Sequence, residues 1–100
     1  MSRPVTKQTI LERVTEMTRQ GREREAEKIL DLKVIRQLIS NAALEGFNRI
    51  TIAPDKAVDV SQTTAAKTAV EALQADGFSI EWEVRRQPDG RTSQSLIVQW

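Results

Sequence analysis

Residues 79–100 carry the sequence SIEWEVRRQPDGRTSQSLIVQW, which predicts a β-hairpin. Apolar and charged residues alternate over 79–86, as in a strand with one buried face and one face in water. The turn signal Pro88-Asp89-Gly90 follows, because proline presets φ at the first central position of a turn and glycine adopts positive φ readily. A second strand is expected over 95–100, again with alternating apolar residues. The hairpin therefore supplies two antiparallel strands.

The segment before the hairpin predicts a third strand and a helix. Residues 49–54 (RITIAP) form a short strand that its proline stops. A helix is expected over 61–75, capped by Ser61 or Asp59 and closed by Gly77. Its apolar residues are mostly alanines, which permit close approach to a sheet. Alternation places the large apolar side chains of the three strands on one buried face: Ile50, Ile52, Ile80, Trp82, Val98 and Trp100.

Two helices are expected before the first strand. The first begins at a capping box, Thr9 to Glu12, or one turn earlier at Pro4, after a loose start over residues 1–8. Gly21 ends or bends this helix. The second helix is expected over about 24–45, because its second half is apolar over most of its circumference and a glycine follows it as a C-cap.

These elements predict an α+β fold with the element order α-α-β-α-β-β in a single domain over residues 1–100. The hairpin strands pair with each other, and a helical crossover joins the first strand to them. We therefore expect a three-stranded sheet in the order 1-3-2, with the last strand in the middle and helices covering one face. Residues 1–21 are expected to form an N-terminal helical arm, and residues 22–100 the α+β core.

The 100 residues include no histidine and no cysteine. This removes the usual near-neutral general base, the usual thiol nucleophile and the usual zinc ligands. An enzyme would need an all-oxygen magnesium or calcium site, but the acidic residues are scattered. The one carboxylate pair on a strand face, Glu81 and Glu83, fits a face in water. We therefore expect a non-enzymatic protein with no metal and no cofactor.

Charge and hydropathy argue against several classes of nucleic-acid-binding, membrane and secreted proteins. Fifteen basic and fourteen acidic side chains leave a formal net charge of +1, which argues against a nucleic-acid coat or a polybasic membrane anchor. Residues 1–8 lack the apolar core of a signal peptide. No apolar run approaches the ~20 residues of a membrane span. We expect a cytoplasmic protein with no membrane partner.

Surplus apolar helix surface is the most unusual feature of the sequence. The two N-terminal helices carry more of it than a small sheet with one covered face can bury. Either the first helix folds back on the second, or both pack against another copy of the chain. We expect a homo-oligomer that also binds an unidentified protein partner. The predicted oligomer interface consists of Ile10, Val14, Met17, Leu30 and Val34.

Two alternative functions involve basic residues. Arg85, Arg86 and Arg91 flank the hairpin turn and should cluster in space. Nucleic-acid binding through these arginines is the first alternative, although the nearest aromatic residues belong to the apolar strand faces and offer no stacking platform. The second alternative is a small anionic ligand held between subunits, with the same arginines or the backbone N–H groups at the start of the 61–75 helix as contacts.

Four features follow one another over about residues 34–100. They are a helix ending Ala-Leu-Glu-Gly at 43–46, an Ile-Thr-Ile strand at 50–52, a helix ending Asp-Gly-Phe at 76–78, and a hairpin ending at Trp100. Together they resemble small accessory proteins of tailed bacteriophages. The resemblance implies a non-enzymatic protein, either a minor virion component or an early protein that binds a host factor or defence component. It also implies residence in the host cytoplasm or in the virion.

Overall fold

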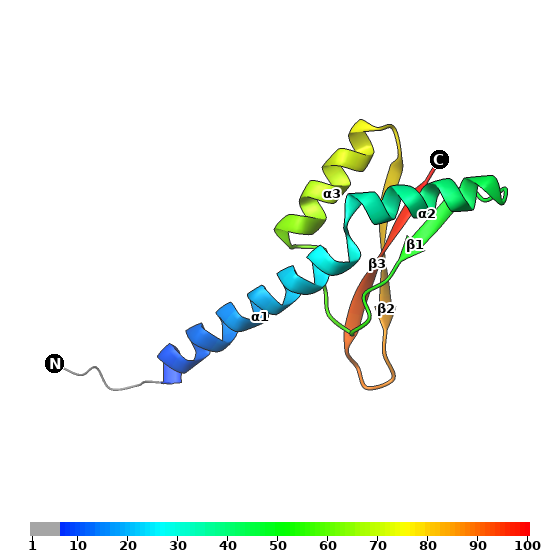
Figure 1. Ribbon diagram of the computed structural model, residues 1–100. Coiled ribbons are helices and arrows are strands. Elements are labelled where there is room, and N and C mark those ends of the chain that lie inside the picture. Colours follow the sequence, from blue (N-terminus) through cyan, green and yellow to red (C-terminus); the bar gives the residue numbers. More distant parts are fainter. Residues whose placement is uncertain (1–6) are drawn as a thin grey trace.

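The computed structural model describes residues 7–100, with side chains from residue 10 onward. Six elements follow one another in the predicted order, and Figure 1 traces them along the chain. The fold is α+β, as expected. The elements are the helices α1 (Lys7–Ile29), α2 (Leu32–Leu44) and α3 (Thr64–Ala75) and the strands β1 (Arg49–Ile52), β2 (Ser79–Arg86) and β3 (Thr92–Gln99).

The sheet has β3 in its middle. This strand pairs antiparallel with both neighbours, so the predicted strand order is confirmed as β1-β3-β2. The strand β2 has the predicted bounds, whereas β3 starts three residues earlier than expected, at Thr92, because it pairs along the whole length of β2. Ile52, Leu96 and Trp82 stand opposite one another in a row across the sheet. This register places the predicted apolar residues on one face.

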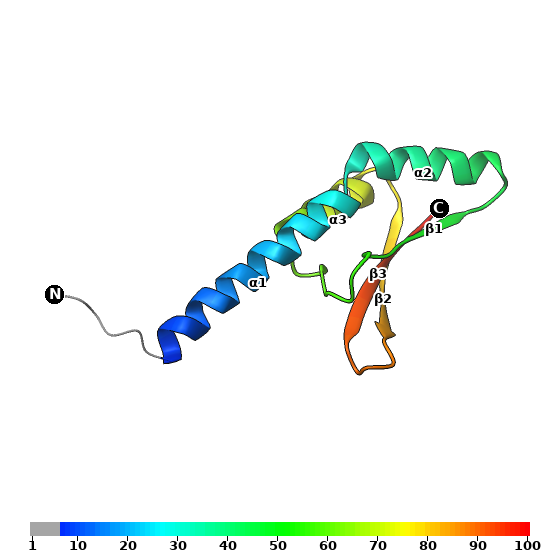
Figure 2. The same ribbon diagram turned by 60° about the horizontal axis from the view of Figure 1, so that its bottom comes forward.

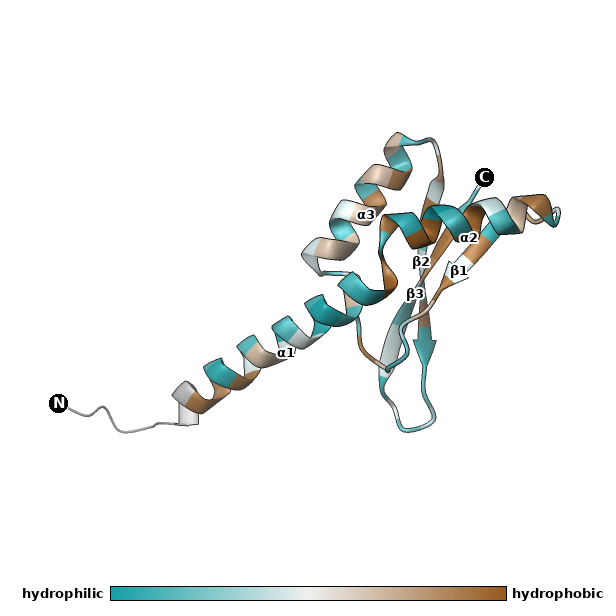
Figure 3. Ribbon diagram, in the orientation of Figure 1, coloured by the Kyte–Doolittle hydropathy of each residue, from teal (hydrophilic) through white to brown (hydrophobic). Residues whose placement is uncertain are grey.

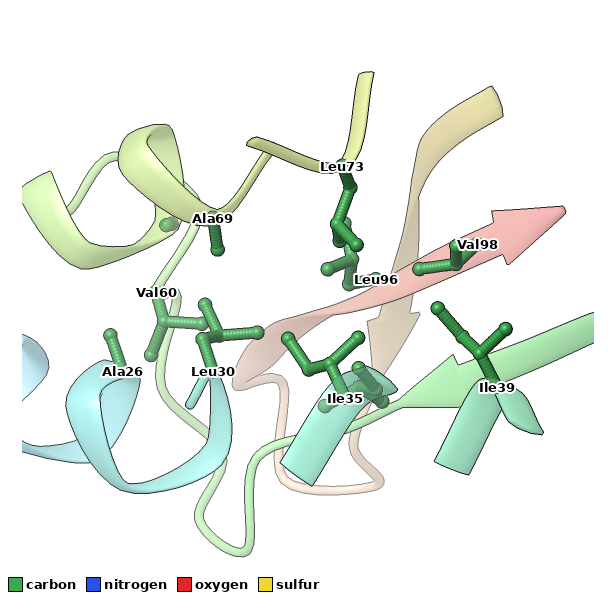
Figure 4. Close-up of a cluster of buried hydrophobic side chains, with 11 residues drawn as sticks. Ala26, Leu30, Ile35, Ile39, Val60, Ala69, Leu73, Leu96 and Val98 are labelled. Atoms are coloured by element: carbon green, nitrogen blue, oxygen red, sulfur yellow. The ribbon is translucent and has the colours of Figure 1, made fainter. Parts of the chain in front are cut away.

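The helices α2 and α3 lie on the same face of the sheet, as Figures 1 and 2 show from two directions. Trp82 is partly buried and packs against the core beneath them, as predicted. Trp100 is less buried than predicted: it is 39% exposed beyond the end of β3 and meets Phe78 edge-on, with 6.0 Å between ring centroids. Figure 4 shows most of the buried core, which comprises Ala26, Leu30, Ile35, Ile39, Ile52, Val60, Ala66, Ala69, Leu73, Leu96 and Val98.

Glycines close two helices as predicted. Gly46 and Gly77 adopt φ angles of 91° and 97°, and the phenylalanine after each donates its backbone N–H to the carbonyl five residues earlier. This is the Schellman pattern that a left-handed residue allows. The start of α3 differs from the prediction. Its N-cap is Thr63 rather than Ser61 or Asp59, because the Thr63 hydroxyl reaches a backbone N–H of the first turn.

The predicted boundary between the first two helices is wrong. The helix α1 runs through Gly21 and continues to Ile29, so the charged segment assigned to the second helix belongs to the first. A glycine in a helix interior costs only about 1 kcal/mol, which is too little to end a helix whose next turns pack on a core. The break lies at Leu30–Asp31, where the Asp31 carboxylate accepts the N–H of Lys33 and caps α2.

The beginning of α1 also differs from the prediction. Thr9 lies inside the helix, so it is not the N-cap of a capping box. Residues 7 and 8 are helical rather than loose. Residues 1–6, with the alternative start at Pro4, lie outside the described residues.

The molecule is elongated because of α1. Its radius of gyration is 17.1 Å and its extents are 64 × 31 × 17 Å, whereas a compact chain of this length has a radius of about 13 Å. Figure 1 shows the first part of α1 pointing away from all other elements. The end of the helix, with Ala26, joins the core together with Leu30, which directly follows the helix. Residues 7–21 of α1 are called the arm from here on.

Candidate functional site

The arm carries an exposed apolar surface. Ile10, Leu11, Val14 and Met17 are each 51–63% exposed. Spacings of three and four residues place them on one side of the helix. Figure 3 shows these hydrophobic segments along the outer part of α1. We call these four side chains the arm stripe. A contiguous group of large apolar side chains in water is typical of a surface that associates with another molecule.

Polar contacts hold the second half of α1 against the core. The Glu23 carboxylate accepts the backbone N–H groups of Thr64 (N···O 2.7 Å) and Ala65 (3.3 Å), at the start of α3. The bond from Thr64 holds the pKa of Glu23 below its ordinary value. The Lys28 ammonium lies 2.7 Å from the Asp55 carboxylate in an exposed ion pair. Together with Ala26, which is buried in the core, these contacts join the second half of α1 to the rest of the fold.

The backbone N–H groups expected to bind an anion at the start of α3 are used by the chain itself. They donate to the Glu23 carboxylate and to the Thr63 hydroxyl. Asp59, in the preceding loop, accepts hydrogen bonds from Ser61 and from Gln94. Burial raises the pKa of Asp59, but these bonds outweigh it and leave the pKa below its ordinary value. The Glu23 carboxylate therefore occupies the position at the start of α3 that an external anion would need.

Of the three arginines beside the hairpin turn, two are paired with carboxylates. The Arg85 guanidinium lies 3.4 Å from the carboxylate of Glu83, and that of Arg91 lies 2.6 Å from the carboxylate of Asp89. The hydrogen bond from Arg91 also holds the pKa of Asp89 below its ordinary value. These pairs reduce the positive potential that a phosphate would meet at the hairpin turn.

The residues of the predicted interface do not form one surface. Leu30 is 5% exposed and belongs to the chain's own core, which removes it from the candidate interface. Val34 is exposed on α2, which extends away from the arm beyond the break between the helices, as both Figure 1 and Figure 2 show. Ile10, Val14 and Met17 remain together on the arm. Leu38 and Leu44 are also exposed on α2, and Phe47 is exposed just after it.

A groove of about 600 Å³ lies between α1, the loop over 56–59 and the hairpin turn. We call it the α1 groove. Gly21 and Arg22 line it from α1, and Arg91 lines it from the hairpin. Glu25 lines it as well and is only 5% exposed, and its Oε2 has no hydrogen-bond donor within the described part of the chain. A buried carboxylate oxygen without a donor is unfavourable in the single chain.

No family model matches the chain, and no curated protein or solved structure is significantly similar to it. None of the described helices is long and apolar enough to cross a membrane. Among residues 7–100, no three acidic side chains are grouped so that they could hold a metal ion.

Proposed function

We propose that this chain is a non-enzymatic interaction protein that self-associates through the arm stripe. One observation carries the proposal: four large apolar side chains, each more than half exposed, lie on a helix that projects from the core. The chain's own fold buries the other end of the same helix but leaves this end uncovered. A second copy presents an identical stripe and would cover it.

The expected affinity follows from the size of the stripe. Covering a half-exposed side chain of this kind contributes roughly 1 kcal/mol, or about 8 kcal/mol for the eight side chains of a pair. Association costs about 4–15 kcal/mol in lost freedom of motion. The arm stripe alone therefore supports weak and reversible association, so the concentration series must reach about 1 mM.

The alternatives have less support. Nucleic-acid binding at the hairpin is disfavoured because Arg85 and Arg91 are paired with carboxylates. Binding of a small anion at the start of α3 is disfavoured because Glu23 accepts the N–H groups there. A role as a phage virion component, or as an early protein in the host cytoplasm, rests on the sequence resemblance, and the genomic neighbourhood of the gene tests it.

Sedimentation equilibrium over a dilution series from about 1 mM to 1 μM tests self-association directly. We expect an average mass that rises with concentration. The variant Met17→Glu places a charge in the arm stripe, where burial in an interface would be costly. It should remain a monomer throughout the series.

The matched control is Arg19→Gln. It changes the net charge by the same amount but lies outside the arm stripe, where the arginine pairs with Glu16 in an exposed contact. This variant should associate like the parent chain. A parent chain that stays monomeric at every concentration would refute the proposal, as would equal effects of the two substitutions.

A further inference from the structure

Gly21 lies on the same side of α1 as the arm stripe, although no contact or backbone angle within the described chain requires a glycine at this position. It lies four residues after Met17 and therefore on the same side of α1. It is not one of the glycines with positive φ. A Cβ built at Gly21 meets no atom of the described residues within 4 Å beyond its own helix. A glycine inside a helix is otherwise unfavourable, so a reason outside the single chain is called for.

The spacing of the stripe indicates how a second copy would pack. Ile10, Val14, Met17 and Gly21 are separated by four, three and four residues, which is the seam of a two-helix coiled coil. In an antiparallel pair, Val14 of one chain faces Met17 of the other, and Ile10 faces Gly21. Each layer then combines a larger with a smaller side chain. A parallel pair would instead place the two glycines opposite each other and leave a void.

The α1 groove lies beside Gly21, where the start of a second, antiparallel α1 would need space. Gly21 lines the groove, and Glu25 lines it one turn further along α1. The first turn of a second α1 would enter the groove when its Ile10 reaches Gly21. Eight stripe side chains, each contributing roughly 40 Å² of covered apolar surface, the area that corresponds to about 1 kcal/mol, cover about 320 Å², which is well below the ~1,200–2,000 Å² of a stable interface. Contacts in the groove would bring the total closer to this range.

We propose that two chains associate through antiparallel arms, with Ile10 of each packed against Gly21 of the other and the first turn of each α1 in the partner's groove. This proposal rests on the proposed self-association and specifies its partner surface and geometry. It gives Gly21 a role in allowing two helices to approach closely.

The substitution Gly21→Ala separates this role from helix stability. Alanine favours the helix, so the thermal midpoint of the diluted monomer should rise. The added methyl group lies at the closest approach of the two arms, so the dimer should weaken by about tenfold or more. Glu12→Ala, which lies on another side of the arm, is the control and should leave the dissociation constant unchanged.

The outcomes distinguish the two proposals. A parent chain without any self-association refutes the proposed function and this inference with it. A parent dimer that Gly21→Ala leaves unchanged or strengthens overturns the inference alone. A dimer weakened by Gly21→Ala and not by Glu12→Ala supports it.

Disulfide cross-linking tests the direction of the arms, because the chain has no cysteine of its own. Arg13 and Gln20 flank the seam, and in antiparallel arms Arg13 of one chain lies beside Gln20 of the other. A mixture of Arg13→Cys and Gln20→Cys chains should therefore form mainly the mixed disulfide. In antiparallel arms the two Ile10 residues lie about 16 Å apart along the axis. Efficient self-cross-linking of Ile10→Cys would show parallel arms and overturn the inference.

Discussion

Replacing Trp82 by alanine should destabilise the fold strongly, because this side chain is the largest that packs against the core. It stands in a row with Leu96 and Ile52, on the face that α2 and α3 cover. Removing a fully buried tryptophan typically costs about 3–5 kcal/mol. Trp82 is partly exposed, so we expect about 2–4 kcal/mol. That is a large share of the ~5–15 kcal/mol that stabilises a small domain.

The assay is urea and thermal unfolding followed by far-ultraviolet circular dichroism, which does not depend on the lost fluorophore. The expected loss corresponds to a fall in the thermal midpoint of about 10–25 °C. Val84→Ala is the matched control, because Val84 lies two residues along the same strand on the same face and is 61% exposed. It should cost about 0.5 kcal/mol or less. Equal losses for the two variants, or an unchanged midpoint for Trp82→Ala, would show that the register of β2 is wrong.

Two further predictions concern charged groups. Because hydrogen bonding from Thr64 lowers the pKa of Glu23 in the folded chain, its contribution to stability is present above its ordinary pKa near 4.5 and is lost as the pH falls through the lower folded value. The difference in urea midpoint between the parent chain and Glu23→Gln should therefore shrink on acidification below pH 4.5, and a difference independent of pH would contradict this. The hairpin should show no salt-dependent binding to mixed DNA or RNA in a mobility-shift assay. Binding that is lost when Arg85, Arg86 and Arg91 are replaced by alanine would overturn this expectation.

Local patterns predicted most of the fold. The alternation over 79–86 assigned both faces of β2, because a strand has a period of two whatever surrounds it. Gly46 and Gly77 were recognised as helix ends because a following phenylalanine and a left-handed glycine form a local motif. The strand order followed from the hairpin and the crossover together.

The helix boundary at Gly21 could not be predicted from local preference. A glycine and a charged run suggest a break, but packing of Ala26 and Leu30 in the core makes one continuous helix favourable. The real break depends on Asp31, which caps α2 with its carboxylate. The sequence contains this capping residue, but the apolar pattern on both sides of it predicts a single helix that runs through it.

The arm stripe was visible in the sequence, whereas its surroundings were not. The spacing of Ile10, Val14 and Met17 identified one apolar side without any structure. The sequence predicts Leu30 in the interface because the pattern of a helix that is apolar on several sides does not show which side packs on the core. Glu23 was missed because it stands in a run of alternating charges typical of a solvated face, and its partners lie 41 and 42 residues away.

Because α1 is one continuous helix, the direction in which the arm stripe faces depends on the number of residues between the stripe and the part of α1 that contacts the core. Each residue turns the helix by about 100° and advances it by about 1.5 Å. Deleting one residue between Met17 and Glu23 would thus rotate the arm by more than a quarter turn relative to α3, while leaving the core itself intact. Inserting seven residues would nearly restore the original angle, since two turns differ from seven residues by only about 20°. Insertions and deletions in this part of α1 would therefore rotate the arm stripe around the helix axis, even where the residues of the stripe stay the same.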